Sequence, residues 1–318
     1  MTILITGGAG FIGSALAKKL VAMGYEIIIV DNFNSYYNPK LKKDRLKYLL
    51  NNYKYKLYSI DIRDYEGLKR IFTENDIDII VHLAAQAGVR YSLTHPFAYH
   101  ETNIGGTLNM LELAKDFKVP RFIYASSSSV YGGNTKTPFS EKDPVDNPLS
   151  LYAATKKATE LLAVTYRNLY GMKVIGLRYF TVYGPWGRPD MAMFLFTDAI
   201  VKGEPINVHN QGKMTRNFSY IDDIVDGTVK AIERDFDQEI INLAANRVVE
   251  LEYYIELIEK NLGKKAIKNY LPMQKGEVQE TLADLEKAKK FLDYEPQWSV
   301  EDGVKSFIAW YKWYYKIG

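Results

Sequence analysis

Tyr152 and Lys156 lie four positions apart, one helical turn, so both side chains project from the same face of a helix. A cation stabilises a phenolate and lowers a tyrosine pKa that is ordinarily about 10, so the pair is a candidate acid/base group. Tyr65 and Lys69 repeat this spacing by chance. Only Tyr152 follows a serine run, residues 126–129, at an expected strand end, where parallel sheets bind ligands. These serines either solvate a loop or, as this convergence favours, join Tyr152 and Lys156 in catalysis.

A glycine-rich turn, Gly7 to Gly13, follows the first expected strand and opens a helix. Its spacing lets the backbone approach a pyrophosphate, while the helix N-terminus offers unpaired amides. Asp31 closes the second strand, where a carboxylate accepts both ribose hydroxyls and repels a 2′-phosphate. No arginine follows at once, so the pattern predicts NAD rather than NADP, with Asp61 near the adenine edge. The alternatives are a turn used only for packing and an aspartate that only ends a strand.

The composition narrows the function classes. The chain has 318 residues, of which 47% are hydrophobic, and no apolar run approaches the roughly 20 residues of a membrane span. Basic and acidic residues number 41 and 38 and are mixed along the chain, unlike the basic footprint of a nucleic-acid binder. There is no cysteine, and the four histidines have no metal-site spacing, so we expect an organic cofactor and no metal. The N-terminus lacks a signal-peptide pattern, which predicts a cytoplasmic protein.

Short apolar strands alternate with helical patterns through the first two thirds of the chain, which predicts a doubly wound parallel sheet of the Rossmann type. The expected strands are 3–6, 26–31, 55–61, 77–83, 121–126 and 174–179, and helices are expected to begin near Phe11, Tyr65, Tyr99 and Leu151. A rigid loop at 184–189 marks a change of pattern. We predict an NAD-binding Rossmann domain over 1–180, rejoined by about 218–245, and a smaller, mainly substrate-binding domain over 181–318.

The C-terminal segment 307–315 is unusually aromatic. It is either a membrane-surface helix or a terminal helix docked on its own domain or on a partner subunit. Few lysines accompany it, which favours docking.

These segments together resemble the extended short-chain dehydrogenase/reductase superfamily over essentially the whole chain. The motifs that carry the resemblance are Gly7–Gly13, Leu83–Gln86, Ser126–Gly132, Tyr152-x-x-x-Lys156 and Tyr179–Pro185. Within the superfamily, the chain looks most like the UDP-glucuronate 4-epimerases, through the segments Asp31–Tyr37, Gln86–Ser92, Gly187–Ala192 and Met273–Val278.

The resemblance implies two sets of binding residues. NAD would contact Gly7, Gly10, Phe11, Ile12, Gly13, Asp31, Asn32, Asp61, Ile62, Leu83, Ala84, Ala85, Asn103, Ser126, Tyr152, Lys156 and Tyr179. The UDP-sugar would contact Arg90, Ser127, Ser128, Ser129, Tyr152, Thr181, Arg188 and Arg216, with Ser127 beside Tyr152 as partner of the reacting hydroxyl. Arg188 is the candidate for a sugar carboxylate and Arg216 for the diphosphate, unless they are surface charges. Related families often carry an arginine where this chain has Gln279.

The resemblance also implies a reaction, the interconversion of UDP-glucuronate and UDP-galacturonate through a transient 4-keto sugar. Similar decarboxylases carry a glutamate directly before Val-Tyr-Gly, whereas this chain has Ser128 and Ser129 there. The alternatives are a UDP-glucose or UDP-N-acetylhexosamine 4-epimerase and, in another class, a non-catalytic NAD-sensing protein. A homodimer is expected, with the helices from Tyr99 and Leu151 at its interface.

Overall fold

The computed structural model describes residues 1–273, 278 and 280–317. At its centre, these residues form a parallel sheet of seven strands in the order β11-β6-β5-β4-β1-β2-β3. The strands are β1 (Thr2–Thr6), β2 (Glu26–Val30), β3 (Lys56–Tyr58), β4 (Ile79–His82), β5 (Arg121–Ser127), β6 (Lys173–Tyr179) and β11 (Gln238–Leu243). All four residues of β4 are buried, as expected for an inner strand whose two faces are covered. The predicted α/β class with a doubly wound parallel sheet is confirmed.

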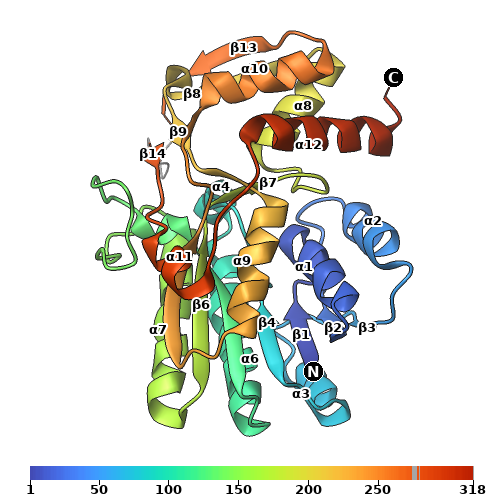
Figure 1. Cartoon of the computed structure of the whole chain (residues 1–318), viewed down its shortest axis with the longest axis vertical. Coiled ribbons are helices and arrows are strands. Elements are labelled where there is room, and N and C mark those ends of the chain that lie inside the picture. The colour runs from blue at the N-terminus through green and yellow to red at the C-terminus, as the bar shows by residue number, and fades with distance from the viewer. Residues whose placement is uncertain (274–277, 279, 318) are drawn as a thin grey trace.

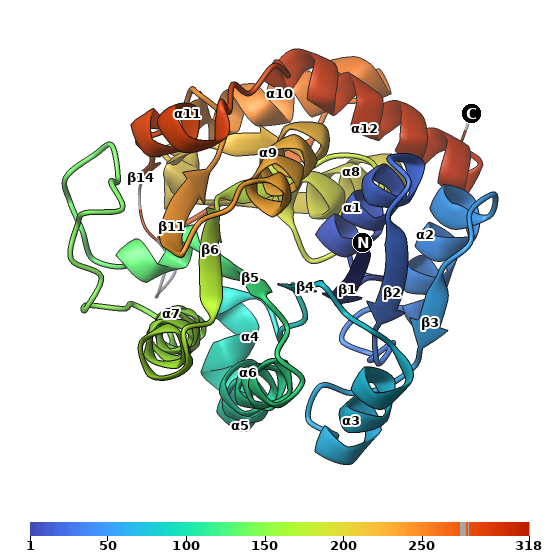
Figure 2. The same cartoon turned by 60° about the horizontal axis from the view of Figure 1, so that its bottom comes forward.

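Helices cover both faces of this sheet (Figure 2). On one side are α1 (Phe11–Ala22), α2 (Pro39–Leu50) and α9 (Ile221–Glu233), and on the other are α3 (Tyr65–Glu74), α6 (Gly106–Asp116) and α7 (Leu151–Tyr170). The predicted helix starts at Phe11, Tyr65 and Leu151 are confirmed. The start of α7 is fixed because the hydroxyl of Ser150 accepts a hydrogen bond from the amide of Ala153 at 3.1 Å.

Several expected elements differ in their bounds by one or two residues, and two differ by more. The helix expected near Tyr99 begins earlier, as α5 (Pro96–Tyr99), and continues through a π-helical turn (His100–Gly105) into α6. The third strand was expected to reach Asp61, but β3 ends at Tyr58. The carboxylate of Asp61 instead closes a turn by accepting the amide of Arg63 at 2.9 Å. A side chain that can bond its own local backbone competes with the ladder of an edge strand.

The chain leaves the sheet after β6 and later returns to it. Strand β11 lies within the segment 218–245 and pairs with β6 in parallel. The return runs through α9, which packs against α1 on the same face of the sheet. Segments 1–180 and 218–245 therefore share one sheet.

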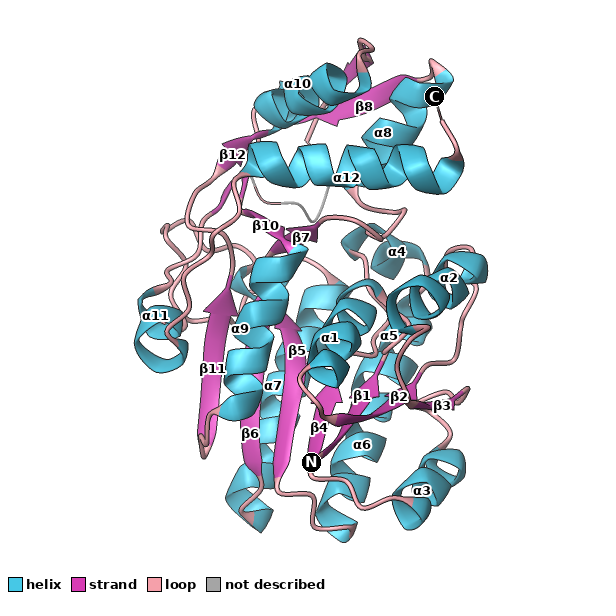
Figure 3. Ribbon diagram, turned by 45° about the vertical axis from the view of Figure 1, so that its right-hand side comes forward, coloured by secondary structure: helices cyan, strands magenta, loops and turns pink. Residues whose placement is uncertain are grey.

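A second lobe sits above the carboxyl ends of the strands (Figure 1, Figure 3). Its main elements are α8 (Ala192–Lys202), β8 (Pro205–His209), α10 (Leu251–Leu262), β13 (Ile267–Leu271) and α12 (Val300–Tyr315). Shorter elements complete the chain: β7 (Thr181–Tyr183), β9 (Thr215–Arg216), β10 (Phe218–Tyr220), β12 (Val249–Glu250), β14 (Glu280–Thr281), α4 (Val89–Thr94) and α11 (Glu286–Leu292).

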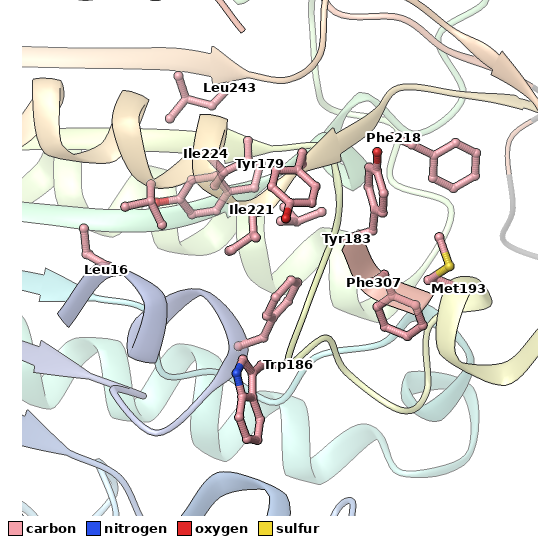
Figure 4. Close-up of a cluster of buried hydrophobic side chains, with 14 of the residues drawn as sticks. Leu16, Tyr179, Tyr183, Trp186, Met193, Phe218, Ile221, Ile224, Leu243 and Phe307 are labelled. Atoms are coloured by element: carbon pink, nitrogen blue, oxygen red, sulfur yellow. The ribbon is translucent and has the colours of Figure 1, made fainter. Parts of the chain in front are cut away.

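The aromatic C-terminal segment forms α12 and docks on its own chain. Phe307, Trp310 and Tyr311 are buried, and the ring of Trp310 lies 5.3 Å from that of Trp186. Figure 4 shows the adjoining cluster, in which Phe307 of the second lobe and Leu16 of α1 belong to one continuous apolar core. Docking rather than membrane contact thus accounts for these rings. Within the described residues, no helix is both long and apolar enough to cross a membrane.

Candidate active site

A cavity of about 1270 Å³ is lined by residues at the carboxyl ends of the strands and by residues of the second lobe. Sites for single small molecules usually measure roughly 300–1000 Å³, so this cavity has room for two ligands at once. One wall is the glycine-rich turn and the ends of β1, β2, β4 and β5. The opposite wall comes from the second lobe, including residues 204–207.

The glycine-rich turn passes directly beneath the cavity. Gly7 has a φ of +68°, and a Cβ atom on Gly13 would lie 2.3 Å from the carbonyl oxygen of Gly7. No side chain caps the N-terminus of α1, which begins at Phe11 on the cavity wall. An uncapped helix N-terminus with the backbone this close is a site for a phosphate group.

Asp31 is buried at the end of β2 and is held by its neighbours. Its carboxylate accepts hydrogen bonds from the amides of Ala9 at 3.1 Å and Phe33 at 2.9 Å. The ammonium of Lys42, which the sequence analysis missed, lies 3.4 Å from the same carboxylate and 3.1 Å from the side-chain oxygen of Asn34. The charge of Asp31 is therefore partly offset by a buried lysine eleven residues further along the chain, in α2.

Tyr152 and Lys156 lie on the first turns of α7, and both line the cavity. The ammonium of Lys156 is buried and donates to the carbonyl oxygen of Ala125 in β5 at 2.8 Å. The hydroxyl of Ser127 lies near enough to Tyr152 to lower its pKa, and it donates to the hydroxyl of Ser129 at 3.1 Å and accepts the amide of Ser129 at 3.1 Å. The structure thus brings together the tyrosine, lysine and serine that the sequence selected.

The pKa of Tyr152 differs from the sequence expectation. Burial raises this pKa above its ordinary value of 10, while the charge of Arg188 and the hydrogen bond from Ser127 lower it. Burial also lowers the pKa of Lys156 to about 8. The net shift is thus upward in the protein chain by itself, and the lowering expected from Lys156 stays a prediction. Desolvation outweighs the neighbouring charges, and the cation that acts on Tyr152 is Arg188.

Arg188 forms an ion pair with Asp190 on the wall of the cavity. Its Nε donates to one carboxylate oxygen at 3.0 Å and its Nη2 to the other at 2.5 Å. Tyr36 donates to the same carboxylate at 3.1 Å. Arg188 is three-quarters buried, so it is not a surface charge. Asp190 and Tyr36 belong to segments that carried the family resemblance, but the sequence analysis did not select them.

Three predicted residues lie partly or wholly behind the cavity wall. Ser126 lines the cavity, but its hydroxyl donates to the buried Glu160 at 2.6 Å. Asn103 holds the backbone of Gln86, accepting its amide at 2.7 Å and donating to its carbonyl at 3.0 Å. Asp61 accepts a hydrogen bond from the side chain of Asn32 at 2.7 Å. Neither Asn103 nor Asp61 lines the cavity directly, and their contacts with NAD stay predictions.

The other predicted residues lie on the wall itself. Arg216 lines the cavity and donates to the carbonyl oxygens of Thr215 at 2.9 Å and Val278 at 2.6 Å. Gln279 and residues 274–277 lie outside the described residues. The remaining predicted residues on the wall are Gly7, Gly10, Ile12, Gly13, Asn32, Ile62, Leu83, Ala84, Ala85, Arg90, Ser128, Ser129, Tyr179 and Thr181.

The model of one protein family, described as the NAD dependent epimerase/dehydratase family, matches residues 3–244. The chain belongs to this family. A relative from Thermodesulfobacterium geofontis, described as a UDP-glucuronate 4-epimerase, is 46% identical over 97% of this chain and 95% of its own length. The resemblance drawn from the sequence motifs is confirmed at the level of the family, which is NAD-dependent.

Solved structures of this family are similar over nearly the whole chain. The UDP-glucuronic acid 4-epimerase of Bacillus cereus, in complex with UDP-glucuronic acid and NAD, has a TM-score of 0.92 and is 36% identical, covering 99% of this chain and 100% of its own. The UDP-glucose 4-epimerase of Thermotoga maritima has a TM-score of 0.91 and is 33% identical, with the same coverage. The fold is thus common to epimerases of charged and of neutral sugars.

Proposed function

We propose that this protein is a UDP-glucuronate 4-epimerase, which interconverts UDP-glucuronate and UDP-galacturonate through a transient 4-keto sugar. The observation that carries the proposal is the neutral pair Ser128 and Ser129, which line the same cavity as Tyr152 and the paired Arg188. Hydroxyl groups hold a carboxylate by hydrogen bonds without repelling it. The names of the 46% identical relative and of the Bacillus cereus neighbour support the same substrate.

The residues present suit NAD. The glycine turn and the start of α1 would hold its pyrophosphate, and Asp31 its adenosine ribose. When bound, NAD supplies a hydride acceptor and donor and adds a positive charge to the cavity. The division into an NAD-binding part, residues 1–180 with 218–245, and a mainly substrate-binding remainder follows as part of this proposal.

Tyr152 and Ser127 would move the proton. As a phenolate, Tyr152 takes the proton of the 4-hydroxyl, and Ser127 aligns that hydroxyl by hydrogen bonding. Arg188 favours the phenolate, because its charge lowers the pKa of Tyr152. The 4-keto sugar then turns about its diphosphate, for which Arg216 is the candidate anchor. The hydride that C4 gave up to bound NAD would return to the opposite face of C4 while Tyr152 gives the proton back to the oxygen, so the alcohol at C4 would be inverted.

A uronic acid adds a hazard, since its 4-keto form is a β-keto acid and loses carbon dioxide when the carboxylate bond aligns with the carbonyl π system. Ser128 and Ser129 would hold the carboxylate out of this alignment. Arg188 would attract the sugar carboxylate only in part, because its guanidinium already forms an ion pair with Asp190. In this arrangement the carboxylate is bound, but its bond to the ring stays out of line with the C4 carbonyl, so carbon dioxide is not lost.

The first test is to incubate the purified protein with UDP-glucuronate, without added NAD, and to follow the sugar by proton NMR. We expect UDP-galacturonate with no release of carbon dioxide, which also requires NAD to copurify. UDP-pentose as the main product would replace the epimerase with a decarboxylase. No change after NAD is added would refute the proposed substrate and the carboxylate-binding roles of Ser128, Ser129 and Arg188.

A UDP-glucose or UDP-N-acetylhexosamine 4-epimerase remains the second candidate, because the Thermotoga maritima neighbour is a UDP-glucose 4-epimerase. Turnover of each sugar in the same NMR assay separates these activities. Tyr152→Phe distinguishes an epimerase from a non-catalytic NAD sensor. In an epimerase this change should remove nearly all turnover and spare the binding of UDP. Tyr65→Phe is the matched control, because Tyr65 and Lys69 have the same spacing on α3, away from the cavity wall.

The surface of α5–α7 supports a further part of the proposal, a homodimer. Large apolar side chains are exposed there, among them Phe97, Leu108, Leu161 and Leu169, with exposed fractions of 75%, 40%, 57% and 66%. A second copy of this face would cover them. We also propose a cytoplasmic location, which cell fractionation would test.

A further inference from the structure

Arg45 of α2 is the largest side chain that is completely buried among the described residues. Within those same residues, no carboxylate lies close enough to form an ion pair with it. Its guanidinium also lies over the ring of Tyr37, 5.4 Å from the ring centre. A buried cation without a counter-ion is costly, and an apolar residue would fill the same space. The position therefore calls for a reason other than packing.

The partners of Arg45 supply that reason, because they come from three separate segments. Nε donates to the carbonyl oxygen of Trp186 at 2.9 Å, and Nη2 to that of Gly187 at 3.2 Å. Nη1 donates to the carbonyl oxygen of Ala9 at 3.3 Å and to the hydroxyl of Tyr37 at 2.6 Å. Only the planar fork of arginine can reach such divergent acceptors at once.

Each of the three segments adjoins a group of the active site. Ala9 lies within the glycine-rich turn, and its amide holds Asp31. Tyr37 follows Tyr36, whose hydroxyl donates to Asp190. Trp186 and Gly187 directly precede Arg188. Arg45 thus ties the cofactor side of the cavity to the ion pair on its sugar side.

The turn that carries Arg188 depends on outside support. Trp186 has a φ of +65°, a left-handed conformation that side chains other than glycine rarely adopt. The ring of Trp186 packs against that of Tyr48 in α2, with ring centres 5.6 Å apart. Helix α2 therefore holds this turn in two ways, because Arg45 binds the backbone of Trp186 and Tyr48 packs against its side chain. Without the fork of Arg45, the turn is free to relax and to shift Arg188.

We propose that Arg45 is a positioning residue that fixes the Arg188–Asp190 pair relative to the glycine-rich turn. In this way it would set both the preference for an acidic sugar and the fate of the 4-keto intermediate, so the inference rests on the proposed function. If the carboxylate is released into alignment, the C5–C6 bond breaks and carbon dioxide leaves. The bonding electrons then form an enolate with the C4 carbonyl, which water protonates at C5 to give a 4-keto pentose.

The experiment compares Arg45→Lys, which keeps the charge but loses the fork, with Lys43→Met, an exposed change on the same helix. The affinities for UDP-glucuronate and UDP-glucose are measured by calorimetry, and the products from UDP-glucuronate by NMR. For Arg45→Lys, we expect the ratio of the two affinities to fall about tenfold in favour of the neutral sugar. Decarboxylated pentose should rise to a measurable share of the product. Both ratios are independent of the fraction of protein that is folded.

If Arg45→Lys does not fold, Gly187→Ala tests the same turn, since a Cβ atom there would lie 2.9 Å from the carbonyl oxygen of Gly184. It should shift both ratios in the same direction. Equal weakening of both sugars, or unchanged ratios in a wild type that epimerises UDP-glucuronate, would overturn the positioning role. A wild type that does not act on UDP-glucuronate would instead refute the proposed function, so the two failures are distinguishable.

Discussion

Replacing Lys156 by methionine should stabilise the folded protein while it removes activity. The side chain is buried, and desolvation lowers its pKa from 10.5 to about 8. Below pH 8 the lysine is protonated in both the folded and the unfolded chain, so folding bears the full cost of burying the charge. At about 1.4 kcal/mol per pKa unit, this cost is about 3 kcal/mol. Methionine removes the cost but gives up the hydrogen bond to Ala125, worth about 1 kcal/mol. The net gain at pH 7 is then about 2 kcal/mol.

The pH dependence gives this prediction its signature. Between pH 8 and 10.5 the folded wild type releases the proton that the unfolded chain still holds, so the wild type gains stability as the pH rises. The advantage of the variant should therefore be complete at pH 7, shrink above pH 8 and vanish by pH 10.5.

Thermal unfolding of NAD-free protein is the assay. With an unfolding entropy of about 2 cal/mol/K per residue, a gain of about 2 kcal/mol raises the midpoint by about 3 °C. The matched control is Lys69→Met, an exposed lysine in the repeated tyrosine–lysine spacing, which should leave the midpoint unchanged. A lower midpoint for Lys156→Met at pH 7, or a difference that stays constant with pH, would refute the reasoning.

Three other predictions follow from buried charges and exposed apolar groups. Asp31→Asn leaves Lys42 without its carboxylate partner, so calorimetry should show the affinity for NADP relative to NAD rising about tenfold, which is about 1.4 kcal/mol. Adding Lys42→Met to this variant should reverse the rise. The buried carboxylate of Glu160 accepts hydrogen bonds from Nε and Nη2 of Arg178 at 2.8 and 2.9 Å. Glu160→Gln leaves this arginine unpaired, which should lower the free energy of unfolding, measured in urea, by about 3 kcal/mol. Leu161→Glu should convert the proposed dimer to a monomer in light scattering, whereas Leu57→Glu, at another exposed position, on the sheet edge, should not.

The parts of the site that the sequence predicted are those whose residues lie close together in the chain. The glycine-rich turn, the strand-ending Asp31 and the helical pair Tyr152 and Lys156 each lie within one strand–helix unit. The geometry of such a unit is set by short-range rules, since parallel strands end at one edge and helices begin there. The alternation of strands and helices predicted the sheet for the same reason.

Residues outside such units escaped prediction because only the tertiary fold brings them together. Lys42 lies eleven positions from the carboxylate it meets, and Asp190 lies 154 positions from Tyr36. Lysine and aspartate are common on surfaces, so their residue types carry no signal by themselves. Conversely, Asn103 lies behind the cavity wall, where its side chain holds the backbone of Gln86. A sequence pattern does not distinguish a side chain that touches a ligand from one that supports the wall.

The upward shift in the pKa of Tyr152 shows that a pKa cannot be predicted from neighbouring charges alone. The sequence placed a cation one turn from Tyr152, which by itself favours the phenolate. The structure buries the same hydroxyl and commits the ammonium of Lys156 to the carbonyl of Ala125, so desolvation prevails and the pKa rises. The charge of Arg188 opposes this rise, as does the hydrogen bond from Ser127, and Asp190 pairs with Arg188. The acid/base group and the sugar-facing ion pair are therefore electrostatically coupled. A change that moves the ion pair should therefore alter proton transfer as well as sugar recognition.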